Sequence, residues 1–270
     1  MKQGDPTTRS RGASPLLAGE EADLTGGSPG AARARPGARL KRALAVLAVP
    51  LAAALGAAAC DRADAPPAAE VSAAEGRETV ELLAGIHQEG IALGDPDAPV
   101  TLVEFADLEC VHCRTFAIEV LPELIRRYVR EGKVRLELRT LAFVSEGSVE
   151  AARMAAAVGL QDRMWHFVDL YFRSQEQPAA PATDRSLRRV AEALPEVDAA
   201  RAMVQRSSPD VTRQLAAAEE QARRFDIQGT PAFLIGRTGE APRRLDLPSL
   251  TPEPFARAVD ELLKEERPGQ

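Results

Sequence analysis

The chain has 270 residues, of which 45% are hydrophobic and 27% charged, an ordinary globular composition that excludes wholesale disorder. Residues 1–59 carry eight Lys or Arg against four Asp or Glu, so residues 60–270 carry 26 against 36, a net charge of −10. A nucleic-acid-binding protein would need the opposite sign, and the three cysteines (Cys60, Cys110 and Cys113) are too few for a disulfide-stapled small fold.

The first segment with a clear pattern is an apolar stretch from Ala43 to Ala59, which follows a cluster of Arg and Lys residues. A positive flank before an apolar core is typical of an export signal, so we expect residues 1–59 to be a leader and the protein to work outside the cytoplasm. An uncleaved membrane anchor is the alternative, although the stretch is short and contains Pro50. Residues 1–38 are of low complexity, and we hypothesise that translation begins downstream of them.

The residues before Cys60 resemble a lipoprotein signal, in which a lipidated cysteine becomes the new N-terminus. Ala57 and Ala59 also satisfy the rule for ordinary signal cleavage, so soluble release is the competing interpretation. The chain that follows is rich in Ala, Pro and Asp and shows no periodicity. We therefore expect residues 60–80 to form a flexible tether, which would hold a lipid-anchored protein away from the membrane.

Residues 81–144 show the pattern of a strand, a helix and a second strand. Val100–Ala106 is apolar and β-branched without alternation, which favours a strand covered on both faces, and it contains one charged residue, Glu104. Apolar residues recur at helical spacing from Phe116 to Tyr128. Val134–Arg139 alternates between apolar and charged residues and predicts the second strand.

Residues 145–225 are predicted to be a helical insertion, whose core we expect to include Trp165. Residues 226–266 return to strand patterns, with a short apolar strand at Pro231–Gly236 and a hairpin partner at Arg243–Leu247. A closing helix follows. The alternation of strands and helices predicts an α/β protein.

The sequence Cys110-Val111-His112-Cys113 lies at the junction between the buried strand and the helix. Zinc requires four ligands, and neither a second Cys pair nor a His cluster follows Cys60, so we expect no metal site. At a helix start the unpaired N–H groups and the helix dipole favour an anion, so Cys110 is predicted to be a reactive thiolate. Cys113, one turn further in, is predicted to be less exposed and to resolve mixed disulfides.

Two neighbours should influence the Cys110 thiolate in opposite directions. The His112 imidazole would stabilise the anion if it lay within reach, whereas a solvent-exposed histidine is the alternative. The Glu109 carboxylate disfavours the anion, but on a wet surface this repulsion is screened. A stabilised thiolate stabilises the reduced protein, so a low Cys110 pKa would make the disulfide form an oxidant.

Several features together resemble the DsbA-like branch of the thioredoxin fold, over about residues 85–266. They occur in the order Leu93–Val100, the strand ending in Glu104-Phe105, the C-x-H-C motif, the helical insertion and Gly229-Thr230-Pro231. The resemblance implies an α/β thioredoxin-like fold with a helical insertion between the two halves of the sheet. It also implies a protein disulfide oxidoreductase that needs no organic cofactor. The family's best-known member has Pro where this chain has Val111, a departure that concerns the redox potential and not the fold.

The resemblance also implies roles for single residues. Pro231 matches the family's cis-proline opposite the dithiol, and Thr230 would offer its backbone to an extended substrate chain, with Val111 also in the substrate-binding set. Glu104 falls where the family keeps a buried acid, which could relay the proton of Cys113 during exchange. The alternative is that Glu104 faces solvent from the end of its strand.

The leading hypothesis is an extracytoplasmic oxidoreductase of the periplasm or cell envelope that donates a Cys110–Cys113 disulfide to reduced exported proteins through a mixed disulfide at Cys110. By resemblance, a quinone-linked membrane protein of the DsbB-like or VKOR-like kind would reoxidise it, and a signal anchor or a lipid on Cys60 would hold it at the membrane. A thiol reductase or disulfide isomerase of the same fold is the second hypothesis. A copper-binding dithiol chaperone is the third, against which stands the absence of a Met cluster.

Overall fold

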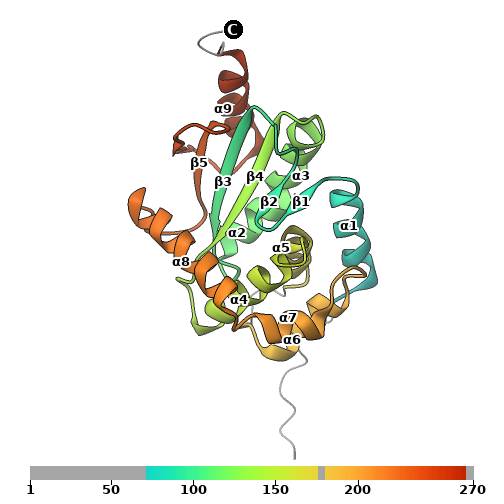
Figure 1. Ribbon diagram of the computed structural model, residues 1–270. Helices are drawn as coiled ribbons and strands as arrows, with labels where there is room; N and C mark the ends of the chain where they lie inside the picture. Colours follow the sequence, from blue (N-terminus) through green and yellow to red (C-terminus); the bar gives the residue numbers. More distant parts are fainter. Residues whose placement is uncertain (1–70, 176–179, 266–270) are drawn as a thin grey trace, which may run out of the picture. The chain divides into compact units, whose positions relative to one another are not determined.

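A computed structural model describes residues 71–175 and 180–265 (Figure 1). Within these residues one mixed sheet has the strand order β1-β2-β4-β3-β5-β6. Its strands are β1 (Gln88–Glu89), β2 (Ala92–Leu93), β3 (Val100–Ala106), β4 (Val134–Thr140), β5 (Ala232–Arg237) and β6 (Arg243–Arg244). The predicted strands and the predicted hairpin partner of β5 are therefore confirmed.

β3 is the central strand, because it pairs in parallel with β4 and antiparallel with β5. All its residues except Thr101 are buried, as an apolar run without alternation predicts for a strand covered on both faces. The helical connection from β3 to β4 consists of α2 (Val111–Thr115), the π-helical segment η1 (Phe116–Val120), α3 (Leu121–Leu124) and a second π-helical segment, η2 (Ile125–Val129).

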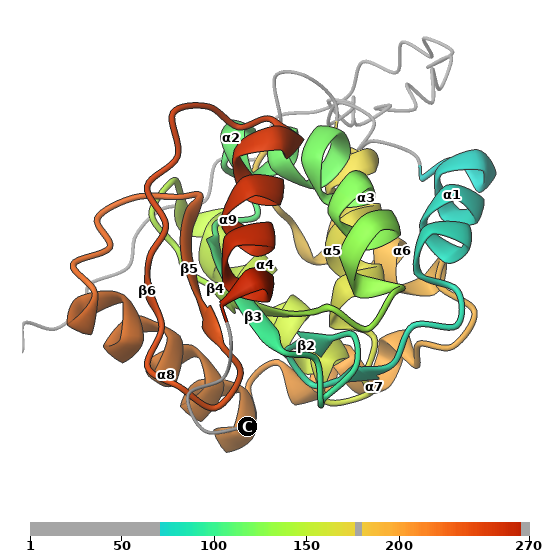
Figure 2. The ribbon, with the colours of Figure 1, turned by 90° about the horizontal axis from the view of Figure 1, so that it is seen from above.

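The helical insertion lies between β4 and β5, as the sequence predicts. It consists of α4 (Glu146–Gly159), α5 (Met164–Arg173), α6 (Asp184–Glu192), α7 (Ala199–Gln205) and α8 (Pro209–Arg224), most of which lie below the sheet in Figure 1. The closing helix, α9 (Pro252–Lys264), lies beside α3 and over β3 (Figure 2). The expected α/β thioredoxin-like fold with an inserted helical unit is confirmed.

A cluster of three aromatic rings joins the connection after α2 to β5 and α9. The rings of Phe116, Phe233 and Phe255 have centroids 4.8 to 5.2 Å apart, which is the separation of favourable aromatic pairs. In the insertion, Trp165 is buried and donates its indole N–H to the Ile91 carbonyl oxygen at 2.9 Å, so its expected role in the core is confirmed. These contacts fix both the connection after α2 and the insertion against the sheet.

The chain is helical in the last part of the predicted tether. We expected residues 60–80 to be flexible, but α1 (Ala73–Leu83) begins directly after Ser72. The Ser72 hydroxyl accepts a hydrogen bond from the Glu75 N–H, and the Glu75 carboxylate accepts one from the Ser72 N–H, which together form a capping box. An Ala-rich segment that lacks periodicity can still form a helix once it has a start signal and a surface to pack against.

That surface is provided by α5. The buried Thr79 hydroxyl donates to the Asp169 carboxylate at 2.5 Å, and Arg173 binds both Asp169 and Glu78 at 2.7 Å. These partners lie about 90 residues apart in the chain, so composition alone could not reveal them.

The other predictions for the N-terminal region concern residues 1–70, which lie outside the described residues. They include the export signal, the lipidation of Cys60 and the first part of the tether. Among residues 71–175 and 180–265, no helix combines the length and apolar character that crossing a membrane requires.

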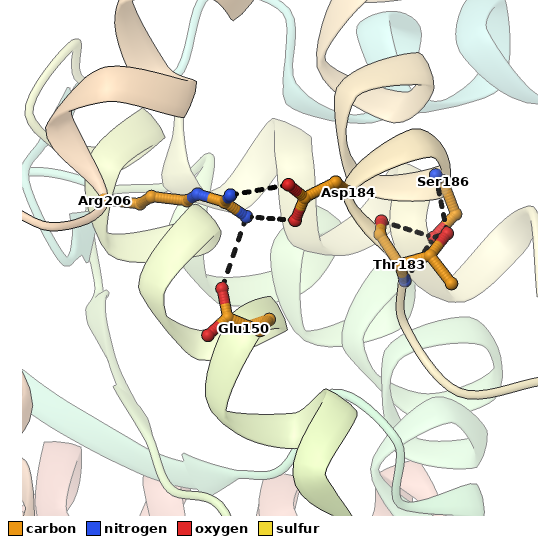
Figure 3. A network of polar contacts seen from close by, with 5 residues as sticks. All are labelled: Glu150, Thr183, Asp184, Ser186 and Arg206. Carbon is orange, nitrogen blue, oxygen red and sulfur yellow. Dashed lines mark hydrogen bonds and ion pairs between the residues drawn. The ribbon is translucent and has the colours of Figure 1, made fainter. Parts of the chain in front are cut away.

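Arg206, at the end of α7, links three helices of the insertion (Figure 3). Its guanidinium donates to both carboxylate oxygens of Asp184 in α6, at 2.6 and 2.8 Å, and to Glu150 in α4 at 3.2 Å. The Thr183 hydroxyl caps the start of α6 by accepting from the Ser186 N–H at 3.1 Å. A forked donor with two acidic partners holds the three helices in one arrangement.

We expect Arg206→Ala to lower the free energy of unfolding by about 1 kcal/mol at neutral pH, because Asp184 is 66% exposed and solvent screens the pair. Hydrogen bonds from Arg206 lower the pKa of Asp184. The stabilisation is therefore complete above the ordinary aspartate pKa and is lost as the pH falls through the lowered value. Urea unfolding measures the change, and Arg213→Ala, which removes an exposed ion pair with Asp210 inside α8, is the control. Equal losses in the two variants would contradict the prediction.

Candidate active site

The two cysteines of the motif lie at the start of α2. Cys110 is the N-cap residue, and its carbonyl oxygen accepts the first helical hydrogen bond from the Arg114 N–H at 3.0 Å. Its sulfur is partly exposed and lies 3.2 Å from the Thr230 carbonyl oxygen, to which the thiol donates. Cys113 is 0% exposed, and neither thiol is bridged. Solvent therefore reaches one sulfur and not the other.

This difference in position gives the two thiols opposite pKa shifts. The hydrogen bond from the Cys113 thiol and those from the backbone N–H groups of Cys113 and His112 lower the pKa of Cys110 to about 5, against the opposing effect of burial. Burial and the hydrogen bond to Cys110 raise the pKa of Cys113. Cys110 is therefore a thiolate at neutral pH, whereas Cys113 keeps its proton.

The Thr230–Pro231 peptide bond is cis, as expected, and brings the Thr230 carbonyl to the Cys110 sulfur. A groove of about 400 Å³ begins beside this loop. Its lining is mostly apolar and consists of His112, Ile227, Pro231, Ala232, Phe233, Arg244, Leu245, Asp246, Leu247 and Leu250. Val111, between the cysteines, is 55% exposed and adds an apolar side chain at the surface next to Cys110.

Glu104 is 5% exposed in the central strand, so its side chain does not face solvent. It lies opposite Leu138 of β4 and Phe233 of β5, and its Oε1 has no hydrogen-bond partner among the described residues. Burial, and next the charge of Cys110, raise the pKa of Glu104 to about 8. The carboxyl group is therefore protonated at neutral pH and electrostatically coupled to the dithiol.

We expected the His112 imidazole to stabilise the Cys110 thiolate if it lay within reach, and the geometry favours the alternative of an exposed histidine. The side chain is exposed and lines the groove, and among the described residues it makes no hydrogen bond to the Cys110 sulfur. What His112 contributes to the lowered Cys110 pKa is its backbone N–H, in addition to the larger effect of the Cys113 thiol. Backbone N–H groups at a helix start point out along the axis towards the N-cap, whereas the side chain projects sideways from the helix.

Glu109 also differs from its expected role as a wet carboxylate that opposes the thiolate. Its carboxylate accepts hydrogen bonds from the Ser145 hydroxyl and the Ala182 N–H. It also lies so close to the Gly147 backbone that a Cβ there would clash with it. Glu109 therefore connects the turn before Cys110 to the start of α4 and to the segment before α6. These contacts form because the helical insertion packs beside the turn.

Sequence reasoning missed Asp107, which is 0% exposed and follows the last residue of β3. Its carboxylate accepts hydrogen bonds from the N–H groups of Glu109, Phe143 and Val144 at 2.6 to 2.9 Å. Its carbonyl oxygen accepts from the Cys110 N–H at 3.0 Å. The sequence did contain one indication of this role. Asp107 directly follows a strand, and an Asp in such a position often accepts a hydrogen bond from the N–H two residues further on, here Glu109, which is an Asx turn.

In the part of the chain that the structure describes, no group of three or more His, Cys, Asp or Glu side chains is placed to hold a metal ion. The site consists of a dithiol, a buried acid, helix N–H groups and a cis-proline loop. Such a set can exchange a disulfide with a thiol, because it offers one accessible sulfur that is a good leaving group and one protected sulfur.

Comparison with known proteins agrees with this chemistry. A thioredoxin family model, Thioredoxin_4, matches residues 87–247. A probable disulfide bond formation protein D of Bacillus cereus is 32% identical over 148 residues, which are 53% of this chain and 68% of that protein.

Solved structures agree in fold. Oxidised BdbD from Bacillus subtilis superposes with a TM-score of 0.57 at 21% identity, over 67% of this chain and 98% of that one. A thioredoxin-like oxidoreductase from Silicibacter pomeroyi gives a TM-score of 0.54 at 25% identity, over 70% of this chain and 99% of that one. The chain therefore belongs to the Thioredoxin_4 family and is a thiol-disulfide oxidoreductase of the DsbA-like kind.

Proposed function

We propose that this protein works outside the cytoplasm and donates a Cys110–Cys113 disulfide to reduced exported proteins through a mixed disulfide at Cys110. The observation that carries the proposal is the inequality of the two thiols, since Cys110 is accessible with a pKa of about 5 and Cys113 is buried with a raised pKa. Disulfide exchange is directional when one sulfur is both the exposed target and the better leaving group.

The reaction begins when a substrate thiolate attacks the Cys110 sulfur of the oxidised protein. The Cys110–Cys113 bond breaks, the mixed disulfide forms, and Cys113 takes up a proton. A second substrate thiolate then attacks the substrate sulfur of the mixed disulfide and releases Cys110 as a thiolate. Two electrons pass from the substrate dithiol to the pair of cysteines, and the substrate gains one disulfide.

Glu104 is the proposed proton donor to the departing Cys113 sulfur. Its pKa of about 8 keeps it protonated at neutral pH, and the raised pKa of Cys113 makes that sulfur a poor leaving group unless it is protonated. In the reverse direction, when Cys113 resolves a mixed disulfide, the Glu104 carboxylate would accept the same proton. The buried acid is thus proposed to move one proton in each direction.

The backbone of Thr230, beside the cis-proline, is proposed to pair with an extended substrate chain next to the Cys110 sulfur. Val111 and the adjoining groove offer apolar contact to such a chain, which suits an unfolded protein. In the proposed reaction the Cys110–Cys113 pair is itself the redox couple.

The direction of electron flow is proposed from the Cys110 thiolate. A thiolate stabilised at neutral pH stabilises the reduced protein, so its disulfide is readily given away. This favours an oxidase over the reductase or isomerase of the same fold. Equilibration with glutathione tests the choice, since an oxidase remains mostly reduced at ratios that oxidise a reductase.

The compartment and partners are proposed from the sequence and the family. The positive flank and apolar core before Cys60 support export, and anchoring by that segment or by a lipid on Cys60 would keep the protein near the membrane. A quinone-linked membrane oxidase is the proposed electron acceptor, because each catalytic cycle leaves a dithiol that must be reoxidised. Intact mass of the membrane-extracted protein tests the anchor.

We expect the ultraviolet thiolate absorbance of the reduced protein to titrate with a midpoint at about pH 5. Cys113→Ala should raise this midpoint, because the strongest hydrogen bond to the Cys110 sulfur comes from the Cys113 thiol. Cys110→Ser should lose the absorbance step at about pH 5, because the remaining thiol of the motif, Cys113, is buried and has a raised pKa. A wild-type midpoint in the ordinary thiol range would contradict the proposed activation.

We expect Glu104→Gln to slow the resolution of a mixed disulfide by Cys113 at least about tenfold, because an amide cannot accept the proton. Rapid-quench measurement of the release of a peptide bound to Cys110 gives the rate. Glu119→Gln, which changes an exposed acid on η1, is the matched control and should leave the rate as in the wild type. Equal rates in all three proteins would remove Glu104 from the mechanism.

A further inference from the structure

Asp107 is a buried carboxylate that the exchange reaction does not use. It lies where β3 ends, and among the described residues its side chain accepts hydrogen bonds from backbone N–H groups rather than from a basic side chain. Oδ1 accepts from Glu109, while Oδ2 accepts from Phe143 at 2.6 Å and Val144 at 2.9 Å. A carboxylate this far from water is retained at a cost unless such bonds compensate it.

The hydrogen bonds of Asp107 join two segments. On one side are the turn residues Glu109 and Cys110, whose N–H groups bind its carboxylate and its carbonyl oxygen respectively. On the other side is the loop after β4, which carries Phe143 and Val144, both more than half exposed. The Leu141 N–H, which donates to the Ala106 carbonyl at 2.8 Å, starts this loop beside the same strand end.

We propose that the Asp107 carboxylate is a positioning residue, which fastens the turn carrying Cys110 to the loop after β4 and so holds the Cys110 sulfur over the N–H groups at the start of α2. The inference rests on the proposed role of the Cys110 thiolate and adds the group that keeps it in place. Asp107 does not touch the substrate or the reacting sulfur, and it acts through the two backbone bonds that orient the N-cap.

Because N–H groups from two segments bind the two carboxylate oxygens, Asp107→Asn tests whether both sets of hydrogen bonds are needed. An amide has nearly the same shape but only one acceptor oxygen, so its NH2 group must face either the Glu109 N–H or the pair of N–H groups at Phe143 and Val144. One side of the fastening is therefore lost in either orientation. Asp169→Asn is the matched control, because Asp169 is 2% exposed and bonds to Thr79 on α1 instead of the turn.

Positioning and simple electrostatics predict opposite results for this change. Removing a negative charge near a thiolate favours the anion and lowers the Cys110 pKa. Loss of positioning moves the sulfur away from the helix N–H groups and raises that pKa. A rise in the pKa therefore cannot come from the lost charge, and a loss of stability alone would not move the pH profile at all.

The experiment is the pH profile of Cys110 alkylation in the reduced full chain, with urea unfolding of the oxidised form as the check on folding. At the wild-type midpoint pH we expect Asp107→Asn to react about fivefold more slowly, the loss that a one-unit rise in pKa produces there. Asp169→Asn should follow the wild-type profile even if it unfolds at lower urea. Asp107→Ala removes the acceptor oxygens without placing an NH2 group against a backbone N–H. It should shift the profile in the same direction as Asp107→Asn.

An unchanged or lowered midpoint in folded Asp107→Asn would overturn the assignment and leave the proposed function intact. The assignment would also be overturned if neither Asp107 variant unfolded cooperatively while Asp169→Asn did. Asp107 would then be required for the fold and not for the position of the thiolate. A wild-type midpoint in the ordinary thiol range would overturn the proposed function and this inference together, and it is measured before any variant is compared.

Discussion

The sulfur of Cys110 lies where three parts of the fold converge: the free N–H groups at the start of α2, the buried thiol of Cys113 and the carbonyl of Thr230. Each group is ordinary by itself. The Cys113 thiol and the helix N–H groups donate to the exposed sulfur and favour a negative charge on it, while burial keeps the proton on Cys113. The rest of the structure can be understood by how it brings these groups to one place and keeps them there.

Parallel pairing of β3 with β4 and antiparallel pairing of β3 with β5 do most of this work. The first brings the end of β3, from which the motif follows, beside the loop after β4. The second brings the start of β5, and with it the cis-proline loop, to the same end of β3, since Phe105 lies opposite Ala232. The ring cluster of Phe116, Phe233 and Phe255 then locks the connection after α2 against β5 and α9.

The helical insertion contributes to the site as well as to the core. Glu109 reaches from the turn before Cys110 to the start of α4, and the Arg114 guanidinium donates to the Phe172 carbonyl oxygen of α5 at 2.8 Å. Gln175, just after α5, donates to the Leu108 carbonyl oxygen at 2.7 Å. The insertion therefore braces the segment on both sides of the motif, and its internal ion pairs, such as those of Arg206, support the site indirectly.

Local patterns in the sequence were sufficient for features that depend on neighbouring residues. The apolar run of β3, the alternation of β4, the helical spacing after Cys113 and the C-x-x-C spacing each follow from side-chain period or from helix-end chemistry. The lower exposure of Cys113 followed from its place one turn further into the helix. The cis-proline came from the family resemblance and not from the residues alone.

Tertiary structure decided the features that depend on residues far apart in the chain. Glu109 was expected to be a surface acid and Asp107 was not singled out, and only the approach of residues 143–145 and 182 shows that both hold the turn in place. The His112 imidazole looked like a partner of the thiolate, but the direction of the side chain at a helix start placed it in the groove. Sequence by itself determined which groups could carry the chemistry; packing decided which of them meet, because hydrogen-bond partners are selected by distance in space and not by separation along the chain.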